Sequence, residues 1–235
     1  MENNYSTAWF ATFMNSINPQ QTAHEVNFLI QQLPQTHYKT MLDVCCGTGR
    51  HAALLSEHGY HVTGIDVNHD ALNQAKTTVP NGVFLQHDMR QIDQFDTTFD
   101  AIICLWQSFG YFDSATNADI MRMFSQKLNP HGRLILDIYH RDCFTQMLGR
   151  REFVYAGRSI IETKAMHADR LHVELVYDDQ HRDVFEWQVF SPDEITKLAK
   201  ACGFTLVLAC TGFDASKPPA STSPRMQLVF EFDNQ

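Results

Sequence analysis

Residues 40–53 read Thr40-Met41-Leu42-Asp43-Val44-Cys45-Cys46-Gly47-Thr48-Gly49-Arg50-His51-Ala52-Ala53, and this stretch decides the fold. Its apolar start is typical of a buried strand, its small residues predict a tight turn, and helix-forming residues follow. Gly47 and Gly49 lack a Cβ atom, so the backbone can adopt positive φ and a ligand can lie directly on it. Free N–H groups at the start of the following helix would then face that ligand.

Two carboxylates are expected at the ends of the first two strands. Asp43 lies inside the end of the first strand, where a carboxylate is costly unless something pairs with it. Residues 61–66 read as a second strand that ends at Asp66. An acid at this spacing, roughly 20 residues after the glycine turn, suits a ribose diol, because a carboxylate can accept hydrogen bonds from both hydroxyls. The pair favours a cationic or hydroxyl-rich ligand over a pyrophosphate.

The composition predicts one α/β domain over residues 1–235. The apolar content of 44% supports a full core. Lys and Arg number 18 against 27 Asp and Glu, which gives a net charge of −9. Without a basic cluster, this balance is a poor match for a phosphate backbone, so we do not expect a nucleic-acid partner.

No apolar run approaches the ~20 residues of a membrane span, and the first residues lack the basic-then-apolar pattern of a signal peptide. We therefore expect no membrane partner. The six cysteines form no CxxC pair, which favours a reducing cytoplasm. The twelve histidines lack the spacing of metal ligands, so we expect no metal.

Alternating strands and helices predict a mainly parallel sheet with helices on both faces. Further strands are expected at 83–86, 100–106, 133–139, 205–210 and 226–232, and helices at 50–58, 115–128 and from the capping box at 191–194 to 203. Residues 129–132, Asn-Pro-His-Gly, predict a turn. Because no helix separates the last two strands, that final pair is predicted to be antiparallel.

Residues 151–190 depart from this alternation. They read as four strands with alternating apolar and polar residues, at 152–156, 158–167, 170–178 and 182–190. This pattern predicts a small antiparallel sheet with one solvated face. We interpret it as an insertion that forms a lid or a wall of the substrate pocket.

Residues 1–38 are expected to form a helical cap. The aromatic stretch at 5–17 predicts one helix, and Ala23, Val26, Ile30 and Leu33 mark the apolar face of a second. Tyr5 and Trp9 are candidates for the substrate pocket. The alternative is that the aromatic residues of this segment simply pack against the core.

The motif Leu42-Asp43-Val44-Cys45-Cys46-Gly47-Thr48-Gly49-Arg50 resembles the first motif of class I S-adenosylmethionine-dependent methyltransferases, which usually reads acid-x-Gly-x-Gly-x-Gly. Cys45 stands at the first glycine position. The resemblance covers roughly residues 42–138. It implies a Rossmann-like seven-stranded sheet with an antiparallel last strand, flanked by helices, and S-adenosylmethionine as cofactor.

The resemblance also implies roles for individual residues. In the family, the acid at the position of Asp66 binds the ribose, the residue at Val67 packs on the adenine, and the acid at Asp88 accepts a hydrogen bond from the adenine amino group. The cofactor-binding set implied for this chain is Asp43, Cys45, Gly47, Gly49, Asp66, Val67, Asp88, Met89 and Leu105.

Several motifs missing from the sequence narrow the class of the methyl acceptor. The fourth strand is not followed by Asn/Asp-Pro-Pro-Tyr/Phe, the mark of enzymes that methylate exocyclic base amines. The chain has no Pro-Cys nucleophile for pyrimidine C5 and no acid at the end of the fourth strand to hold Mg²⁺. A small molecule is the favoured acceptor, and a protein or an RNA is the fallback.

Four residues outside the cofactor set are candidates for the acceptor pocket. Trp106 ends the fourth strand and is expected to form a pocket wall. Tyr111 and His140 are candidate general bases, although Tyr111 as a wall and His140 as a solvated residue are the alternatives. Arg225 follows a long loop and is a candidate for holding an acidic acceptor.

Two other functions compete with methyl transfer. Residues 47–52 formally satisfy G-x-G-x-x-G/A, and Asp66 would suit the ribose of a nicotinamide dinucleotide in an NAD(P)-dependent oxidoreductase. Against this, Asp43 would face the pyrophosphate, Asp88 adds a second acid, and the antiparallel final pair does not belong to that fold. The other alternative is a protein that binds S-adenosylmethionine without catalysis.

Overall fold

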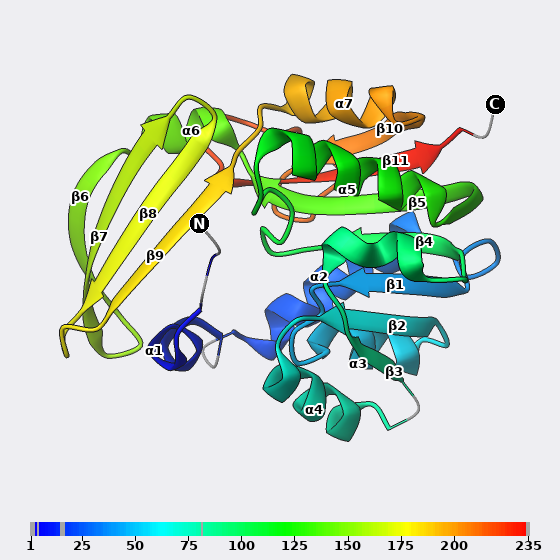
Figure 1. Ribbon diagram of the computed structural model, residues 1–235, viewed down its shortest axis with the longest axis horizontal. Helices are drawn as coiled ribbons and strands as arrows, with labels where there is room; N and C mark the ends of the chain where they lie inside the picture. The colour runs from blue at the N-terminus through cyan, green and yellow to red at the C-terminus, as the bar shows by residue number, and fades with distance from the viewer. Residues whose placement is uncertain (1–2, 4, 15–16, 81, 234–235) are drawn as a thin grey trace.

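The computed structural model describes residues 3, 5–14, 17–80 and 82–233, which form two sheets (Figure 1). The larger sheet has seven strands in the order β10-β11-β5-β4-β1-β2-β3, and the smaller has four in the order β6-β7-β8-β9. The strands of the larger sheet are β1 Thr40–Val44, β2 His61–Asp66, β3 Val83–Gln86, β4 Phe99–Cys104, β5 Leu128–Tyr139, β10 Phe204–Cys210 and β11 Arg225–Phe232. The predicted fold class is confirmed.

The larger sheet is parallel except for β11, which runs antiparallel to both β5 and β10. The parallel pairs place the carboxyl ends of β1, β2 and β4 at one edge. The predicted antiparallel final pair is confirmed. This edge is where an open α/β sheet binds ligands.

Helices cover both faces of the larger sheet (Figure 1). On one face lie α2 Pro19–Gln32, α3 Arg50–Glu57 and α4 His69–Thr78; on the other lie α5 Ser114–Gln126, α7 Pro192–Ala201 and the 3₁₀ helix η2 Met89–Gln94. Side chains that alternate along β1 feed the two cores, with Met41 in one and Leu42 in the other. Among the described residues, no helix is long and apolar enough to cross a membrane.

Two predictions about the N-terminal segment needed correction. The segment expected as one helix at 5–17 contains a short α1, Thr7–Trp9, and a π-helix η1, Phe10–Met14. On α2, Ala23 is exposed and Glu25 is fully buried. The face of α2 is rotated because the Glu25 carboxylate pairs with side chains of α3.

The predicted turn at 129–132 lies inside β5. Strand pairing jumps from Phe99–Leu128 to Ala101–Arg133, so several β5 residues bulge out at this point. Asn129 Nδ2 donates a hydrogen bond to Asp100 Oδ1 at 2.7 Å and thereby ties the bulge to β4. The turn-forming residues 129–132 therefore lie in the bulge, and the strand begins at Leu128 instead of the predicted residue 133.

Strand β4 ends at Cys104, before its predicted end at Trp106. The backbone N–H of Trp106 donates to Asp137 Oδ2 at 2.9 Å, and that of Gln107 donates to the Asp137 carbonyl at 2.9 Å. These bonds turn the chain out of the sheet. The short helix α6, Arg141–Thr145, and η2 were not predicted.

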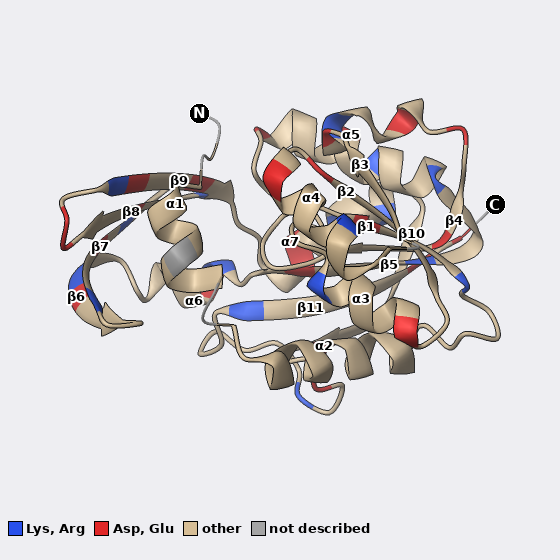
Figure 2. Cartoon of the chain, turned by 90° about the horizontal axis from the view of Figure 1, so that it is seen from below, with Lys and Arg blue, Asp and Glu red and all other residues tan. Residues whose placement is uncertain are grey.

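The smaller sheet consists of β6 Gly149–Tyr155, β7 Arg158–His167, β8 Arg170–Tyr177 and β9 Arg182–Gln188, all antiparallel to their neighbours. The sequence predicted these four strands to within a few residues. The sheet lies beside the carboxyl edge of the larger sheet, and α1 packs against one of its faces (Figures 1 and 2).

The loop after β4 joins the two sheets at Gly110. The backbone N–H of Gln188 in β9 donates to the Gly110 carbonyl at 2.7 Å. Gly110 has φ +106°, and a Cβ atom there would lie 2.4 Å from the Gln188 carbonyl oxygen. A side chain at this position would therefore collide with the backbone of β9.

We expect Gly110→Ala to lower the free energy of unfolding by about 3 kcal/mol, through left-handed backbone strain and overpacking. Urea titration followed by circular dichroism measures this change. The matched control is Gly157→Ala, at φ +79° with open space where the methyl group would lie; it should cost about 1–2 kcal/mol from backbone strain alone. Equal losses in the two variants would contradict a tight junction at Gly110.

Candidate active site

A cavity of about 910 Å³ lies between the carboxyl edge of the larger sheet, the N-terminal segment and the smaller sheet. Of the residues singled out from the sequence, Gly49 and His140 do not line it. Those that do are Asp43, Cys45, Gly47, Asp66, Val67, Asp88, Met89, Leu105, Trp106, Tyr111, Arg225, Tyr5 and Trp9. The cavity thus collects residues from distant parts of the chain.

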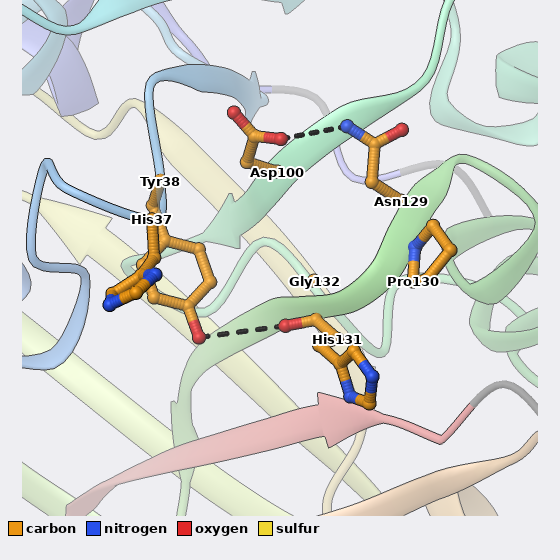
Figure 3. A pocket seen from close by; sticks show the side chains of 7 residues that line it. All are labelled: His37, Tyr38, Asp100, Asn129, Pro130, His131 and Gly132. Atoms are coloured by element: carbon orange, nitrogen blue, oxygen red, sulfur yellow. Dashed lines mark hydrogen bonds between the residues drawn. The ribbon is translucent and has the colours of Figure 1, made fainter.

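A second cavity of about 410 Å³ lies at the β5 bulge (Figure 3). Its only carboxylate, that of Asp100, is fully engaged by the backbone N–H groups of Lys39 and Thr40, the Thr40 hydroxyl and Asn129. Figure 3 shows Asn129 pointing at Asp100. Nothing polar is left over for a ligand at this carboxylate, so the larger cavity is the candidate site.

The glycine turn leaves room for a ligand. Gly47 has φ +54°, and a Cβ atom there would have nothing within 4 Å. Gly49 has φ +73° and forms the N-cap of α3, where a Cβ atom would lie 2.9 Å from that of Ala75. Gly49 therefore shapes the turn from behind, while Gly47 faces open space.

Asp66 is fixed at the cavity wall by backbone donors. The Gly47 N–H donates to Oδ2 and the Asn68 N–H donates to Oδ1, both at 2.8 Å. Burial raises the pKa of Asp66, while these donors oppose the rise. Asn68 also caps α4 through its side chain, as predicted. The carboxylate is thus held in one orientation before any ligand arrives.

Asp43 is the least satisfied carboxylate of the site. It is 2% exposed, and its Oδ2 atom has no hydrogen-bond partner among the described residues. Burial raises its pKa to about 7, although the positive charge of Arg50 opposes the rise. A buried, unpartnered carboxyl group that lines a cavity fits the cationic part of a ligand.

The neighbouring strand ends provide an apolar and an acidic contact. Val67 follows β2 and is 62% exposed where it lines the cavity. Asp88 caps η2 by accepting from the Arg90 N–H at 2.8 Å and forms an ion pair with the Arg90 guanidinium. Hydrogen bonds from Arg90 outweigh burial and lower the pKa of Asp88, so this carboxylate is ionised.

Trp106 lies between two guanidinium groups. The Cζ atoms of Arg50 and Arg225 each lie 4.5 Å from its ring centroid. Its indole Nε1 donates to Glu25 Oε1 at 2.9 Å. Trp106 has φ +55°, so the ring is held by these contacts in an uncommon backbone conformation.

Sequence reasoning missed Glu25, which anchors this arrangement. Its other oxygen accepts from Arg50 Nη1 and contacts His51 Nε2, both at 2.7 Å. Burial raises the pKa of Glu25, but the hydrogen bond from His51 and the charge of Arg50 outweigh burial and lower the pKa to about 2. Burial lowers the pKa of His51 to about 4. The signal in the sequence was an acid among the apolar residues of α2.

Arg225, the candidate for holding an acidic acceptor, has an internal partner. Its Nε donates to Asp137 Oδ1 at 3.1 Å, and its Nη2 lies in ion-pair contact with Oδ2 without hydrogen-bond geometry. Gln227 Nε2 also donates to Asp137 Oδ1, at 2.8 Å. Burial lowers the pKa of Arg225 to about 10, so it stays charged and paired at neutral pH.

The two candidate bases have different surroundings. Tyr111 lines the cavity, and its hydroxyl lies 2.9 Å from that of Tyr5. Burial raises the pKa of both phenols, so both are neutral at pH 7. His140 is 3% exposed at the start of α6, and its Nδ1 has no partner among the described residues.

Aromatic side chains form the wall opposite the glycine turn. Tyr5 stacks on Phe185 at 4.7 Å between ring centroids, and Phe185 stacks on Trp187 at 5.5 Å. Trp9 lies 4.4 Å from Tyr5. The N-terminal segment and the smaller sheet thus form one aromatic surface on the cavity wall.

Comparison with known proteins agrees with this geometry. Residues 41–132 match a family model described as "Methyltransferase domain". The chain is 28% identical over 199 residues to "Putative methyltransferase YqeM" of Bacillus subtilis, covering 77% of this chain and 80% of that protein. It is 25% identical over 194 residues to a glycine/sarcosine N-methyltransferase of Aphanothece halophytica, covering 78% and 73%.

The fold is also similar to solved structures. An S-adenosylmethionine-dependent methyltransferase from Clostridium acetobutylicum superposes with a TM-score of 0.81 at 16% identity, over 97% of each chain. The unpartnered Asp43 carboxyl group, the open face of Gly47 and the fixed Asp66 carboxylate fit a cationic adenosyl cofactor. Residues 41–132 thus match a methyltransferase domain, and the chain has the fold of a solved S-adenosylmethionine-dependent methyltransferase.

Proposed function

We propose that this protein methylates a small molecule bound between Trp106 and the aromatic wall. The observation that carries the proposal is the single cavity in which the glycine turn and its acids share space with the Tyr5 and Phe185 rings. The relatives support a small acceptor, since one is named for glycine and sarcosine and another for an amino sugar.

The cofactor end of the cavity assigns a role to each acid. Asp66, with both oxygens oriented by backbone donors, would accept hydrogen bonds from the ribose hydroxyls. Val67 would pack on the adenine, and Asp88 would accept from the adenine amino group. Asp43 would face the positively charged part of the cofactor. Cys45, Met89 and Leu105 complete this end of the cavity.

The bound cofactor supplies a sulfonium methyl group that is already a good electrophile. The chain must therefore orient the acceptor and exclude water, a proximity effect worth up to about 7–11 kcal/mol. Tyr111 and Tyr5 are neutral phenols, so they would donate or relay a hydrogen bond to the acceptor rather than take its proton. Trp106, clamped by two arginines, would form the rigid opposite wall.

The proposal extends to domain organisation, partners and compartment. We infer one domain over residues 1–235, with a cap at 1–38 and an inserted sheet at about 151–190. Lys and Arg lie scattered among Asp and Glu (Figure 2), which supports a small molecule over a nucleic acid. All six cysteines are free thiols, which suits a reducing cytoplasm.

The function is tested by incubating the protein with methyl-labelled S-adenosylmethionine and a fractionated metabolite extract. We expect label in a small-molecule fraction and release of S-adenosylhomocysteine. Asp66→Ala is the control: it should weaken S-adenosylhomocysteine binding by about 1.5–3 kcal/mol, because hydrogen bonds to a charged group are lost. Absence of label from every small-molecule fraction, or unchanged affinity in the variant, would refute the respective assignment.

Asp43 gives the site a pH dependence. Its pKa is raised to about 7, so the folded chain binds this proton more tightly than the unfolded chain and loses stability as pH rises from about 4 to above 7. We expect Asp43→Asn to raise Tm more at pH 8 than at pH 5. For a chain of this size, about 1 kcal/mol of stability corresponds to about 2–4 °C in Tm. Differential scanning calorimetry measures both.

The same variant should bind the cofactor product more weakly. Wild-type affinity for S-adenosylhomocysteine should rise between pH 6 and pH 8 as Asp43 ionises, whereas Asp43→Asn should bind weakly with a flat profile over that range. Titration calorimetry distinguishes the two. Identical pH profiles would mean that Asp43 does not face the ammonium group, the cation that S-adenosylhomocysteine keeps after the sulfonium charge is lost.

We expect Tyr111→Phe to reduce kcat by about 10-fold or more while leaving S-adenosylhomocysteine affinity unchanged, because a hydrogen bond at the acceptor is lost. His140→Ala is the comparison, since His140 does not line the cavity. Once an acceptor fraction is identified, initial rates measure both. A larger loss of kcat in His140→Ala than in Tyr111→Phe would assign the contact with the acceptor to His140 instead of Tyr111.

A further inference from the structure

A charged cluster lies in the acceptor part of the cavity, on the smaller sheet. Arg151 on β6 and Glu162 and Lys164 on β7 all line the cavity. The Glu162 carboxylate pairs with both the Lys164 ammonium and Nε of Arg151, through the same oxygen atom. Alternation along β7 places Glu162 and Lys164 on the buried face, where a strand normally carries apolar residues.

Elsewhere along the cavity, each arginine has its own carboxylate. Arg50 pairs with Glu25, Arg90 with Asp88 and Arg225 with Asp137. In the cluster, two cations share one carboxylate. Within the described part of the chain, this is the place on the cavity wall where positive charge exceeds negative charge.

The cations of the cluster also have unused donors. The Lys164 side chain is 4% exposed and hydrogen bonds to Glu162, although an ammonium group has three N–H donors. Arg151 engages Glu162 through Nε, and its guanidinium lies 4.8 Å from the ring of Phe153, which also lines the cavity. Because the Lys164 ammonium is buried, leaving its remaining N–H donors without partners is costly, and they favour an acceptor group from a ligand. The Arg151 side chain is 54% exposed, so it adds positive charge at the cavity rather than buried donors.

We propose that Arg151 and Lys164 bind an anionic oxygen group of the methyl acceptor, a carboxylate or a phosphate. The proposal rests on the proposed function and adds the chemical class of the acceptor. The aromatic wall would hold the body of that molecule, and the anionic group would lie at the smaller sheet, away from the acids Asp43 and Asp66. Glu162 already accepts from two cations, so it is not free to bind a cationic acceptor.

The cluster can be tested with a probe that has the required chemistry. 8-Anilinonaphthalene-1-sulfonate carries aromatic rings and one anionic group, and N-phenyl-1-naphthylamine is its neutral counterpart. Both are titrated by fluorescence into protein saturated with S-adenosylhomocysteine. Lys164→Met and Arg151→Gln should each weaken the anionic probe by about 10-fold, as expected for a hydrogen bond to a charged group, and leave the neutral probe unchanged.

Glu162→Gln distinguishes cations that bind a ligand from cations that only form a structural salt bridge. Removing the carboxylate that competes for the two cations should tighten the anionic probe, whereas a merely structural salt bridge would predict no gain. Arg150→Gln is the matched control, because Arg150 is exposed on β6 and does not line the cavity. It should change neither probe.

Weaker binding of the anionic probe to Glu162→Gln, or equal loss of both probes in Arg151→Gln, would overturn the proposal, as would failure of the wild-type protein to bind the anionic probe. Calorimetry with S-adenosylhomocysteine is run on every variant. If the wild-type protein does not bind S-adenosylhomocysteine, the proposed function is refuted instead, so the two failures are distinguishable.

Discussion

Two buried carboxylates hold the site together. Glu25 on α2 and Asp137 on β5 each pair with an arginine, Arg50 on α3 and Arg225 on β11, and the two guanidinium groups sandwich Trp106. One aromatic ring thereby connects the glycine turn, the N-terminal helices and the antiparallel end of the sheet. Because both carboxylates are fully buried, removing either arginine would leave a buried negative charge uncompensated, which is more costly than losing a surface ion pair.

This constraint separates two tasks within the cavity. The arginines near the cofactor end are neutralised by their own carboxylates, so the remaining acids, Asp43 and Asp66, set the local charge. A cationic donor is favoured there. At the smaller sheet the balance is reversed, because Arg151 and Lys164 outnumber their one carboxylate. The cavity is therefore polarised along its length, which would fix the direction in which an acceptor enters.

Local patterns in the sequence were sufficient for much of the fold. Strands β2 and β3 were predicted with their observed bounds, because a short apolar run ends at an acid or a turn residue in each case. The capping box at Ser191 and the cap at Asn68 were predicted from nearest neighbours and are present. The residues at the cofactor end of the cavity came mainly from the resemblance to the methyltransferase motifs, and they meet at one edge because strand-end residues of parallel strands share it.

The missed features depend on contacts between distant residues. Glu25 was hidden because its partners lie on another helix, and Arg225 was assigned to a ligand because Asp137 is far away in sequence. The early end of β4 also follows from Asp137, whose carboxylate and carbonyl draw the next two N–H groups out of the sheet. Sequence spacing alone does not carry that information.

The unpartnered state of Asp43 follows from the same division of charge. Arg50 is close enough to lower the pKa of Asp43 but is hydrogen bonded to Glu25, so it does not complete an ion pair with Asp43. A carboxyl group left in this state destabilises the folded chain in the absence of a ligand. The binding of a cation would recover that cost, so stability is given up at the position where affinity is gained.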